Sequence, residues 1–119
     1  MVVKRIVLDI ATDSVATLQS FYSELFGLEP IMDQGWIVTL ASQDHARVQI
    51  SIASEGGSGA PVPNASIEVE DVNVVYERAK SMGCKIEYDL VDEPWGVRRF
   101  FLLDPAGNLL NVLSHTTQS

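Results

Sequence analysis

The stretch that decides the fold covers residues 94–111 and reads PWGVRRFFLLDPAGNLLN. Its middle part, residues 97–103, carries the apolar and aromatic side chains that favour a β-strand. Asp104, Pro105 and Gly107 follow as the residues of a tight turn, because proline presets φ at the second turn position and glycine tolerates a positive φ. A second apolar run begins directly after the turn. The stretch therefore predicts a strand, a tight turn and a returning strand.

The elements before this stretch follow an order that occurs twice in the chain. The first copy opens with an alternating strand at residues 4–10, followed by a helix that Asp13 or Ser14 caps and Gly27 ends. Apolar residues at helical spacing predict the buried stripe of this helix, which consists of Leu18, Phe21, Tyr22 and Leu25. Three short strands are expected next, near residues 29–33, 36–40 and 47–53.

The second copy repeats this plan. It opens with a strand at residues 64–70, and Asp71 and Gly83 mark the two ends of its helix. The buried stripe predicted for this helix consists of Val72, Val75, Ala79 and Met82. The strands expected after it lie near residues 85–90, 97–103 and 108–114.

Each copy is a βαβββ module, and the linker-like stretch between them is residues 55–61, EGGSGAP, whose Gly and Ser residues predict flexibility. We expect one domain over residues 1–119, with modules at about 1–54 and 62–119. Pairing the modules side by side would bury both helices. The predicted fold class is α+β, with the two modules pairing into a curved mixed sheet that has a concave cleft.

Strand alternation predicts which side chains line this cleft. In the first strand Ile6, Leu8 and Ile10 should pack under the helix, which leaves Val7 and Asp9 on the cleft side. One of the neighbouring residues Arg98 and Arg99 should also face the cleft, and alternation leaves open which one. The full set of expected ligand-binding residues is Val7, Asp9, Trp36, Gln49, Ser51, Asn64, Ser66, Glu68, Trp95, Arg98, Phe100 and Asn111.

Two segments of the chain carry a resemblance to a known family. Residues 94–111 resemble the C-terminal signature of the vicinal-oxygen-chelate superfamily, and residues 21–28, FYSELFGL, are similar to its first-helix pattern. This superfamily includes glyoxalase I, extradiol dioxygenases, fosfomycin-resistance enzymes and bleomycin-resistance proteins. The resemblance covers essentially the whole chain and implies the two-module fold. Pro94-Trp95-Gly96 is similar to the bleomycin-resistance-like members, so the resemblance is closest to that metal-free branch.

The resemblance also tells where a metal site would lie. Metal-dependent members take His, Gln or Glu ligands from four strands, and the matching positions here are Val7, Gln49, Asn64 and Asn111. Of these, Gln49 alone matches in residue type, whereas a catalytic metal typically takes three protein ligands with imidazole, thiolate or carboxylate donors. We therefore expect no metal and no cofactor. An atypical set formed by Asp9, Glu68 and His115 stays open as an alternative.

Three functions are compatible with these residues. The first is a metal-free small-molecule binding protein that sequesters an organic ligand in the cleft. Trp95 would stack on this ligand, and Asp9 and Glu68 would allow it to be cationic. The second is a divalent-metal-dependent lyase, isomerase or dioxygenase, as the superfamily resemblance would imply. The third is protein contact through the concave face. The missing metal ligands favour the first function, with no catalytic residue.

Composition limits the partners of the chain. The formal net charge is −8, and the 8 Lys and Arg residues are scattered, which disfavours nucleic acid because its phosphates need clustered cations. No apolar run approaches the roughly 20 residues that a membrane span needs. The first residues do not follow the pattern of an export signal, so a cytoplasmic location is expected. Small members of the superfamily commonly dimerise, and we expect a homodimer by this analogy.

Overall fold

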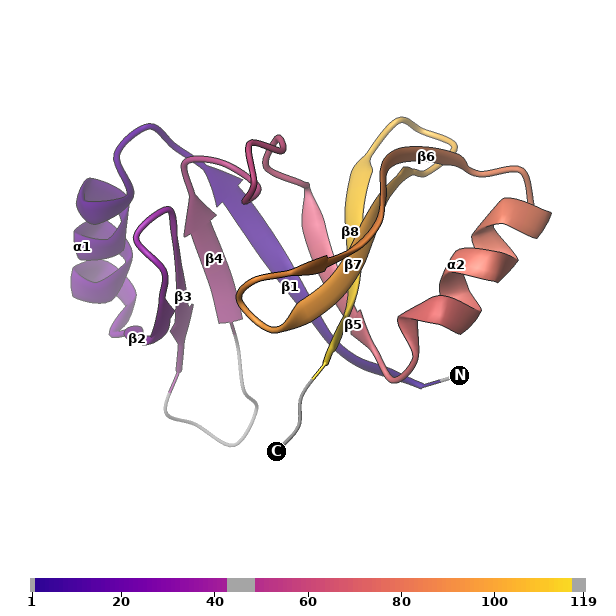
Figure 1. The fold of residues 1–119 in the computed structure, drawn as a ribbon. Coiled ribbons are helices and arrows are strands. Elements are labelled where there is room, and N and C mark those ends of the chain that lie inside the picture. The colour runs from indigo at the N-terminus through magenta and orange to yellow at the C-terminus, as the bar shows by residue number, and fades with distance from the viewer. Residues whose placement is uncertain (1, 43–48, 117–119) are drawn as a thin grey trace. The chain divides into compact units, whose positions relative to one another are not determined.

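A computed structural model describes residues 2–42 and 49–116 of the chain and shows eight strands and two helices in this part (Figure 1). The predicted α+β class is confirmed. The chain divides into two compact units, which we call the N-terminal unit (Val7–Val62) and the C-terminal unit (Met1–Ile6 with Pro63–Ser119). Neither of the two helices is long and apolar enough to cross a membrane.

The N-terminal unit has the predicted βαβββ order. Its elements are the second half of β1 (Val3–Ala11), α1 (Val15–Phe26), β2 (Glu29–Asp33), β3 (Ile37–Ala41) and β4 (Gln49–Ala53). The strand order is β2-β3-β4-β1, in which β1 and β4 are parallel and the other neighbours are antiparallel. Residues 47 and 48, where the sequence predicts the start of the last strand, lie outside the described residues.

The C-terminal unit repeats this arrangement. Its elements after the start of β1 are β5 (Ala65–Val69), α2 (Val72–Ser81), β6 (Lys85–Glu93), β7 (Val97–Leu103) and β8 (Leu109–His115). The strand order is β5-β8-β7-β6, with β5 and β8 parallel and the other neighbours antiparallel. The two units therefore share one pairing pattern, which confirms the predicted internal repeat. The expected cleft between the modules stays a prediction.

Helix α1 packs on its own sheet with a narrower stripe than the sequence predicts. Leu18 and Tyr22 lie with Val15 against the core of Val38, Leu40 and Ile52. Phe21 and Leu25, which were expected in the same stripe, are exposed. The reason is geometric, because a single helix on one face of a sheet contacts β3 and β4 along one side only.

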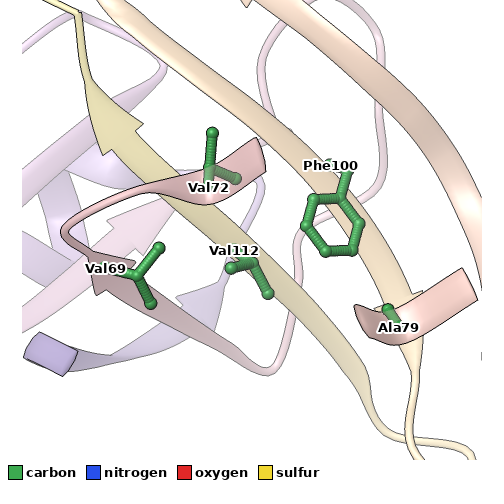
Figure 2. Packing of buried hydrophobic residues seen from close by; sticks show 5 residues of the cluster. All are labelled: Val69, Val72, Ala79, Phe100 and Val112. Atoms are coloured by element: carbon green, nitrogen blue, oxygen red, sulfur yellow. The ribbon is translucent and has the colours of Figure 1, made fainter. Parts of the chain in front are cut away.

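Helix α2 follows its prediction more closely. The Asp71 side chain caps it by accepting a hydrogen bond from the Asn73 N–H at 3.0 Å. Val72 and Ala79 are buried against side chains of β5, β7 and β8, and Figure 2 shows this cluster of Val69, Val72, Ala79, Phe100 and Val112. Met82 was expected in the stripe but is exposed, because the helix ends at Ser81.

In strand β1 the burial of the side chains differs from the prediction. Val7, expected on the cleft side, is buried, whereas Ile6 and Leu8, expected under a helix, are 65% and 56% exposed. Only Ile10 of the expected set joins the core below α1. The cause is coverage, since α1 packs mainly on β3 and β4 and α2 on β6, β7 and β8, so that of these three side chains only Ile10 reaches the core below a helix.

The predicted flexible linker is a hydrogen-bonded loop. The Gly56 N–H donates to the Ala60 carbonyl at 2.6 Å, and the Ala60 N–H donates to the Gly57 carbonyl at 2.9 Å. The Glu55 side chain accepts the Gly59 N–H at 3.0 Å. The glycines that suggest flexibility in the sequence thus permit close backbone approach instead, since a Cβ at Gly56 would collide with the Pro61 carbonyl.

The tight turn after β7 is confirmed. The Asp104 carboxylate accepts the N–H groups of Ala106 at 2.9 Å and Asn108 at 2.8 Å, and Gly107 has a φ of 87°. Hydrogen bonds from the side chain and backbone of Asn108 lower the pKa of Asp104 below its usual value. Local side-chain chemistry therefore sets this turn, as the sequence indicates.

Candidate functional site

The sheet of the C-terminal unit has one face under α2 and one turned away from it, which we call the distal face. Phe100 lies in the core under α2, and the Arg98 Nε donates to the Asn73 side chain of α2 at 2.9 Å. Strand alternation therefore places their neighbours Arg99 and Phe101 on the distal face. This corrects the expectation that Arg98 and Phe100 contact a ligand, and it settles which arginine faces away from the helix.

Arg99 is the centre of the distal face. It is only 3% exposed, and its Nε donates to the Glu93 carboxylate at 2.7 Å. The Tyr88 hydroxyl donates to the same carboxylate oxygen at 2.6 Å. The guanidinium carbon lies 4.9, 5.0 and 4.8 Å from the ring centroids of Tyr88, Trp95 and Phe101. A buried ion pair is thus enclosed by three aromatic rings, the geometry of cation–π contact.

Trp95 reaches this cluster from the turn between β6 and β7. The turn is closed by the Gly96 N–H, which donates to the Glu93 carbonyl at 3.2 Å, and Gly96 has a φ of 90°. The indole is half-buried against the Arg99 guanidinium. The structure therefore brings the predicted residue Trp95 together with Arg99, Tyr88 and Phe101. The sequence left Arg99 open as the alternative to Arg98, whereas Tyr88 and Phe101 were absent from the predicted set, although the aromatic content of β6 and β7 is visible in the sequence.

Asn111 and Asn64, the two asparagines expected to line the cleft, lie in different environments. The Asn111 Nδ2 donates to the Ser66 hydroxyl at 3.0 Å, and Asn111 stands opposite Phe101 in the β7–β8 register, so both amide and hydroxyl lie on the distal face. The Asn64 side chain instead accepts the Leu109 N–H at 2.8 Å. Its oxygen fixes the start of β8 beside β5, which makes Asn64 a structural residue rather than a cleft residue.

Glu68 is surrounded by basic side chains. Its carboxylate lies 3.0 Å from the Arg5 Nε, 3.9 Å from the Lys4 Nζ and 2.9 Å from the His115 Nδ1. His115 is the last residue of β8 and stands opposite Val97 in the register. The charge of Glu68 is matched by these partners, so the expected role of Glu68 in attracting a cationic ligand loses its basis.

In the N-terminal unit the predicted polar residues lie on β1 and β4. Asp9 stands beside Ser51 in the β1–β4 register, and the Ser51 hydroxyl shares a buried hydrogen bond of 2.7 Å with Thr39 of β3. The sequence reasoning missed Thr39, although its position between Val38 and Leu40, which pack under α1, indicates the opposite face. Gln49, the first residue of β4, is half-buried.

Trp36 lies directly before β3 and is half-buried. Its carbonyl accepts the Ser54 N–H at 2.9 Å, so its backbone joins the start of β3 to the end of β4. The structure brings Trp36 into this turn of the N-terminal unit.

Three of the four positions that correspond to metal ligands do not supply the donors that such a metal needs. Val7 has no donor atom, and the Asn64 oxygen is bonded to the Leu109 N–H. Asn111 offers only an amide, and amide oxygens are poor ligands for Zn²⁺, Ni²⁺ or Fe²⁺. Glu68 and His115 are in contact, yet residues 2–42 and 49–116 contain no group of three or more His, Cys, Asp or Glu side chains that could hold a metal ion.

Comparisons with known proteins agree with this fold. The sequence model of the Glyoxalase/Bleomycin resistance protein/Dioxygenase superfamily matches residues 4–112. The chain is 29% identical over 114 residues to an anthracycline biosynthesis protein, DauV, of Streptomyces sp. (strain C5). This alignment covers 88% of the chain but only 39% of that relative, so the chain spans less than half of its length.

Solved structures show the same architecture. A structure described as NAD-dependent benzaldehyde dehydrogenase from Legionella pneumophila superposes with a TM-score of 0.78 at 14% identity and covers 94% of this chain and all of that one. Methylmalonyl-CoA epimerase (Q60A) of Streptomyces coelicolor superposes with a TM-score of 0.69 at 16% identity and covers 98% of this chain and all of that one. At such identities the likeness shows the fold alone.

Proposed function

Because the chain belongs to the Glyoxalase/Bleomycin resistance protein/Dioxygenase superfamily, we propose that it acts as the bleomycin-resistance-like members do, as a metal-free binding protein. In this proposal it sequesters a planar aromatic organic molecule and releases it chemically unaltered. The ligand binds on the distal face, beside Trp95.

The observation that carries this proposal is the aromatic enclosure of Arg99. Its ion pair with Glu93 holds the guanidinium in place, and the guanidinium holds the rings of Tyr88 and Trp95. Both rings are half-buried, so each keeps part of its surface for a ligand. Rings fixed in advance lose little conformational entropy on binding, and a flat apolar ligand stacks well on them.

The class of ligand follows from the chemistry of such rings and from the curated relative. The name of that relative places it in anthracycline biosynthesis, and anthracyclines are planar, fused-ring aromatic compounds. Stacking on Trp95 and Tyr88 suits this shape. A charge preference is weak in this proposal, because Glu68 is already paired and only the net charge of −8 attracts a cation at long range.

The metal-dependent lyase, isomerase or dioxygenase is the alternative that this proposal replaces. Such an enzyme needs donor atoms at the matching positions, and Val7 and Asn64 do not supply them. The expected homodimer and cytoplasmic location stay predictions. Light scattering at micromolar concentration tests the dimer, and a mass equal to one chain would contradict it.

The experiment that tests the proposed function is a fluorescence titration of chelator-treated protein. The probes are doxorubicin, an anthracycline with a cationic amino sugar, and 1,2-dihydroxyanthraquinone, which lacks that cation. We expect saturable binding of both in the presence of EDTA. Trp95→Ala should weaken binding by about tenfold, which corresponds to about 1.4 kcal/mol and lies within the range of aromatic stacking. Phe21→Ala, which removes an exposed ring of α1, is the control and should keep the wild-type affinity.

Two results would contradict the proposal. One is a lack of saturable binding by either probe together with a thermal shift caused by a single transition metal, which would restore the metal-dependent alternative. The other is recovery of a chemically altered probe after incubation, which mass spectrometry would detect and which sequestration does not produce.

A further inference from the structure

A histidine–carboxylate pair lies on the distal face, on different residues from those that enclose Arg99. Ile67 and Val112 pack in the core under α2, so alternation places Glu68 of β5 and His115 of β8 on the distal face. The His115 Nδ1 is 2.9 Å from a Glu68 carboxylate oxygen. The pair thus lies on the same face of the sheet as Trp95 and Arg99.

The pair is held in one orientation. The second oxygen of Glu68 lies 3.0 Å from the Arg5 Nε, so both oxygens of the carboxylate have a basic partner. A carboxylate only accepts hydrogen bonds, and the proton of the contact therefore belongs to the His115 Nδ1. In the neutral ring the lone pair is then on Nε2. In known acid–base pairs, a carboxylate that accepts a hydrogen bond from one imidazole nitrogen fixes this tautomer.

The two side chains of the pair differ in their exposure to solvent. The Glu68 side chain is 13% exposed, whereas the His115 side chain is 55% exposed. The charged groups near the ring come from two strands. Glu68 belongs to β5, and Lys4 and Arg5 of β1 contact the Glu68 carboxylate. The neighbour from β7 in the register is the apolar Val97. An imidazolium formed at this position would face the Glu68 carboxylate directly.

We propose that His115, oriented by Glu68, is the proton acceptor of the distal face and ionises an acidic phenolic hydroxyl of the bound aromatic ligand. This inference rests on the proposed function and names the ligand class more closely, as a hydroxylated planar aromatic. The O–H bond of the ligand breaks, the proton binds the His115 Nε2, and the electron pair stays on the phenolate oxygen. The new imidazolium is stabilised by Glu68, and its Nε2–H remains hydrogen-bonded to the phenolate.

The test uses 1,2-dihydroxyanthraquinone, whose visible absorption moves to longer wavelength when it loses a phenolic proton. Spectra are recorded for free and bound dye across a pH series that brackets the pKa of the free dye. We expect the wild-type protein to lower the apparent pKa of the bound dye by about one unit, as a nearby proton acceptor with a counter-charge does. The dimethoxy analogue has no acidic hydroxyl and serves as the control, which should bind without this spectral change.

Two variants separate the inference from the proposed function. His115→Gln should lose the shift of the dye pKa and therefore bind the ionised dye up to about tenfold more weakly, while its affinity for the dimethoxy analogue stays at the wild-type value. Glu68→Gln, which removes the charge behind the ring, should lose most of the shift. Since His115 is exposed, we expect the melting temperature of His115→Gln to stay near that of wild type, which confirms that the variant is folded.

The possible outcomes distinguish the role of His115 from the proposed function. Wild-type protein that binds the dye without shifting its pKa overturns the role of His115 and leaves the proposed function intact. A shift that persists in His115→Gln has the same meaning. Failure of the wild-type protein to bind the dye at all overturns both.

Discussion

Replacement of Arg99 with methionine would remove the cation at the centre of the distal face while keeping much of its volume. The two charged side chains are 3% and 4% exposed and 2.7 Å apart, so the change leaves the Glu93 carboxylate buried without the guanidinium, while the Tyr88 hydroxyl still donates to it. Three aromatic rings lose their contact with the guanidinium at the same time.

The magnitude follows from the burial of this pair. Removing one partner of a buried ion pair costs about 3–5 kcal/mol, because the other charge stays in a poorly solvating environment. For a chain of 119 residues this corresponds to a fall in melting temperature of roughly 12–20 °C. Arg98→Met is the matched control in the next residue. Its ion pair with Asp92 is 3.2 Å long and only partly buried, and its hydrogen bond to Asn73 also lies at the surface, so we expect a loss of about 1 kcal/mol or less.

Urea denaturation of the two single variants and of the Arg99→Met/Glu93→Gln double variant measures these differences. The double variant has no uncompensated charge and keeps an oxygen that accepts from Tyr88, so it should recover about 1–3 kcal/mol relative to additivity. A loss for Arg99→Met as small as that for Arg98→Met, with additive effects in the double variant, would refute the assignment of Arg99 and Glu93 as a coupled buried pair.

Further predictions concern a loop, a buried hydroxyl and a turn. Gly56→Ala should lower the free energy of unfolding by more than about 2 kcal/mol, because the new Cβ collides with a backbone carbonyl of the same loop; urea denaturation with an unchanged stability would argue against the observed loop. Ser114→Ala should cost about 1–3 kcal/mol by thermal unfolding, since the hydroxyl accepts the first N–H of α2 at 2.8 Å and leaves that group unpaired when removed. Asp104 has a pKa lowered by hydrogen bonds from Asn108, so its contribution to stability is present above its usual pKa of 3.8 and is lost as the pH falls through the folded-state value. Asp104→Asn should therefore reduce the steepness of the acid limb in a pH series of melting temperatures, and an identical acid limb would speak against this role.

The order of elements could be predicted from the sequence because local chemistry sets most boundaries. Asp71 begins α2 by a side-chain hydrogen bond to its first turn, and Asp104 closes the turn after β7 in the same way. The C′ residue of α1, Gly27, has a φ of 70°, which glycine adopts without strain. Such signals need only a few neighbouring residues, and the structure confirms them.

Which side chains of several strands and helices are buried could not be predicted, because burial depends on elements that are distant in the sequence. Arg98-Arg99 followed by Phe100-Phe101 has the same pattern in either phase, and only the position of α2 places Phe100 in the core. Leu8 has the spacing of a core residue but is exposed, because α1 packs mainly on β3 and β4.

Of the partners of the candidate site, the sequence left open only that Glu68 and His115 come together, and it did not indicate Arg5. Glu68 contacts Arg5 and His115, which are far from it in the chain and reach it only through the register of β1, β5 and β8. The register of a parallel pair such as β5 and β8 leaves no local turn signal that a sequence could show. Trp95 could be predicted because its proline–glycine turn is local, whereas its stacking on Arg99 could not.

The central claim is that a planar aromatic ligand binds the distal face without a metal. The most direct measurement is a ¹H–¹⁵N correlation spectrum of chelator-treated protein titrated with doxorubicin. The account predicts saturable shifts of the Trp95 indole N–H and of the Arg99 Nε–H. A spectrum that stays unchanged in the presence of EDTA, or one in which only the Trp36 signal moves, would contradict it.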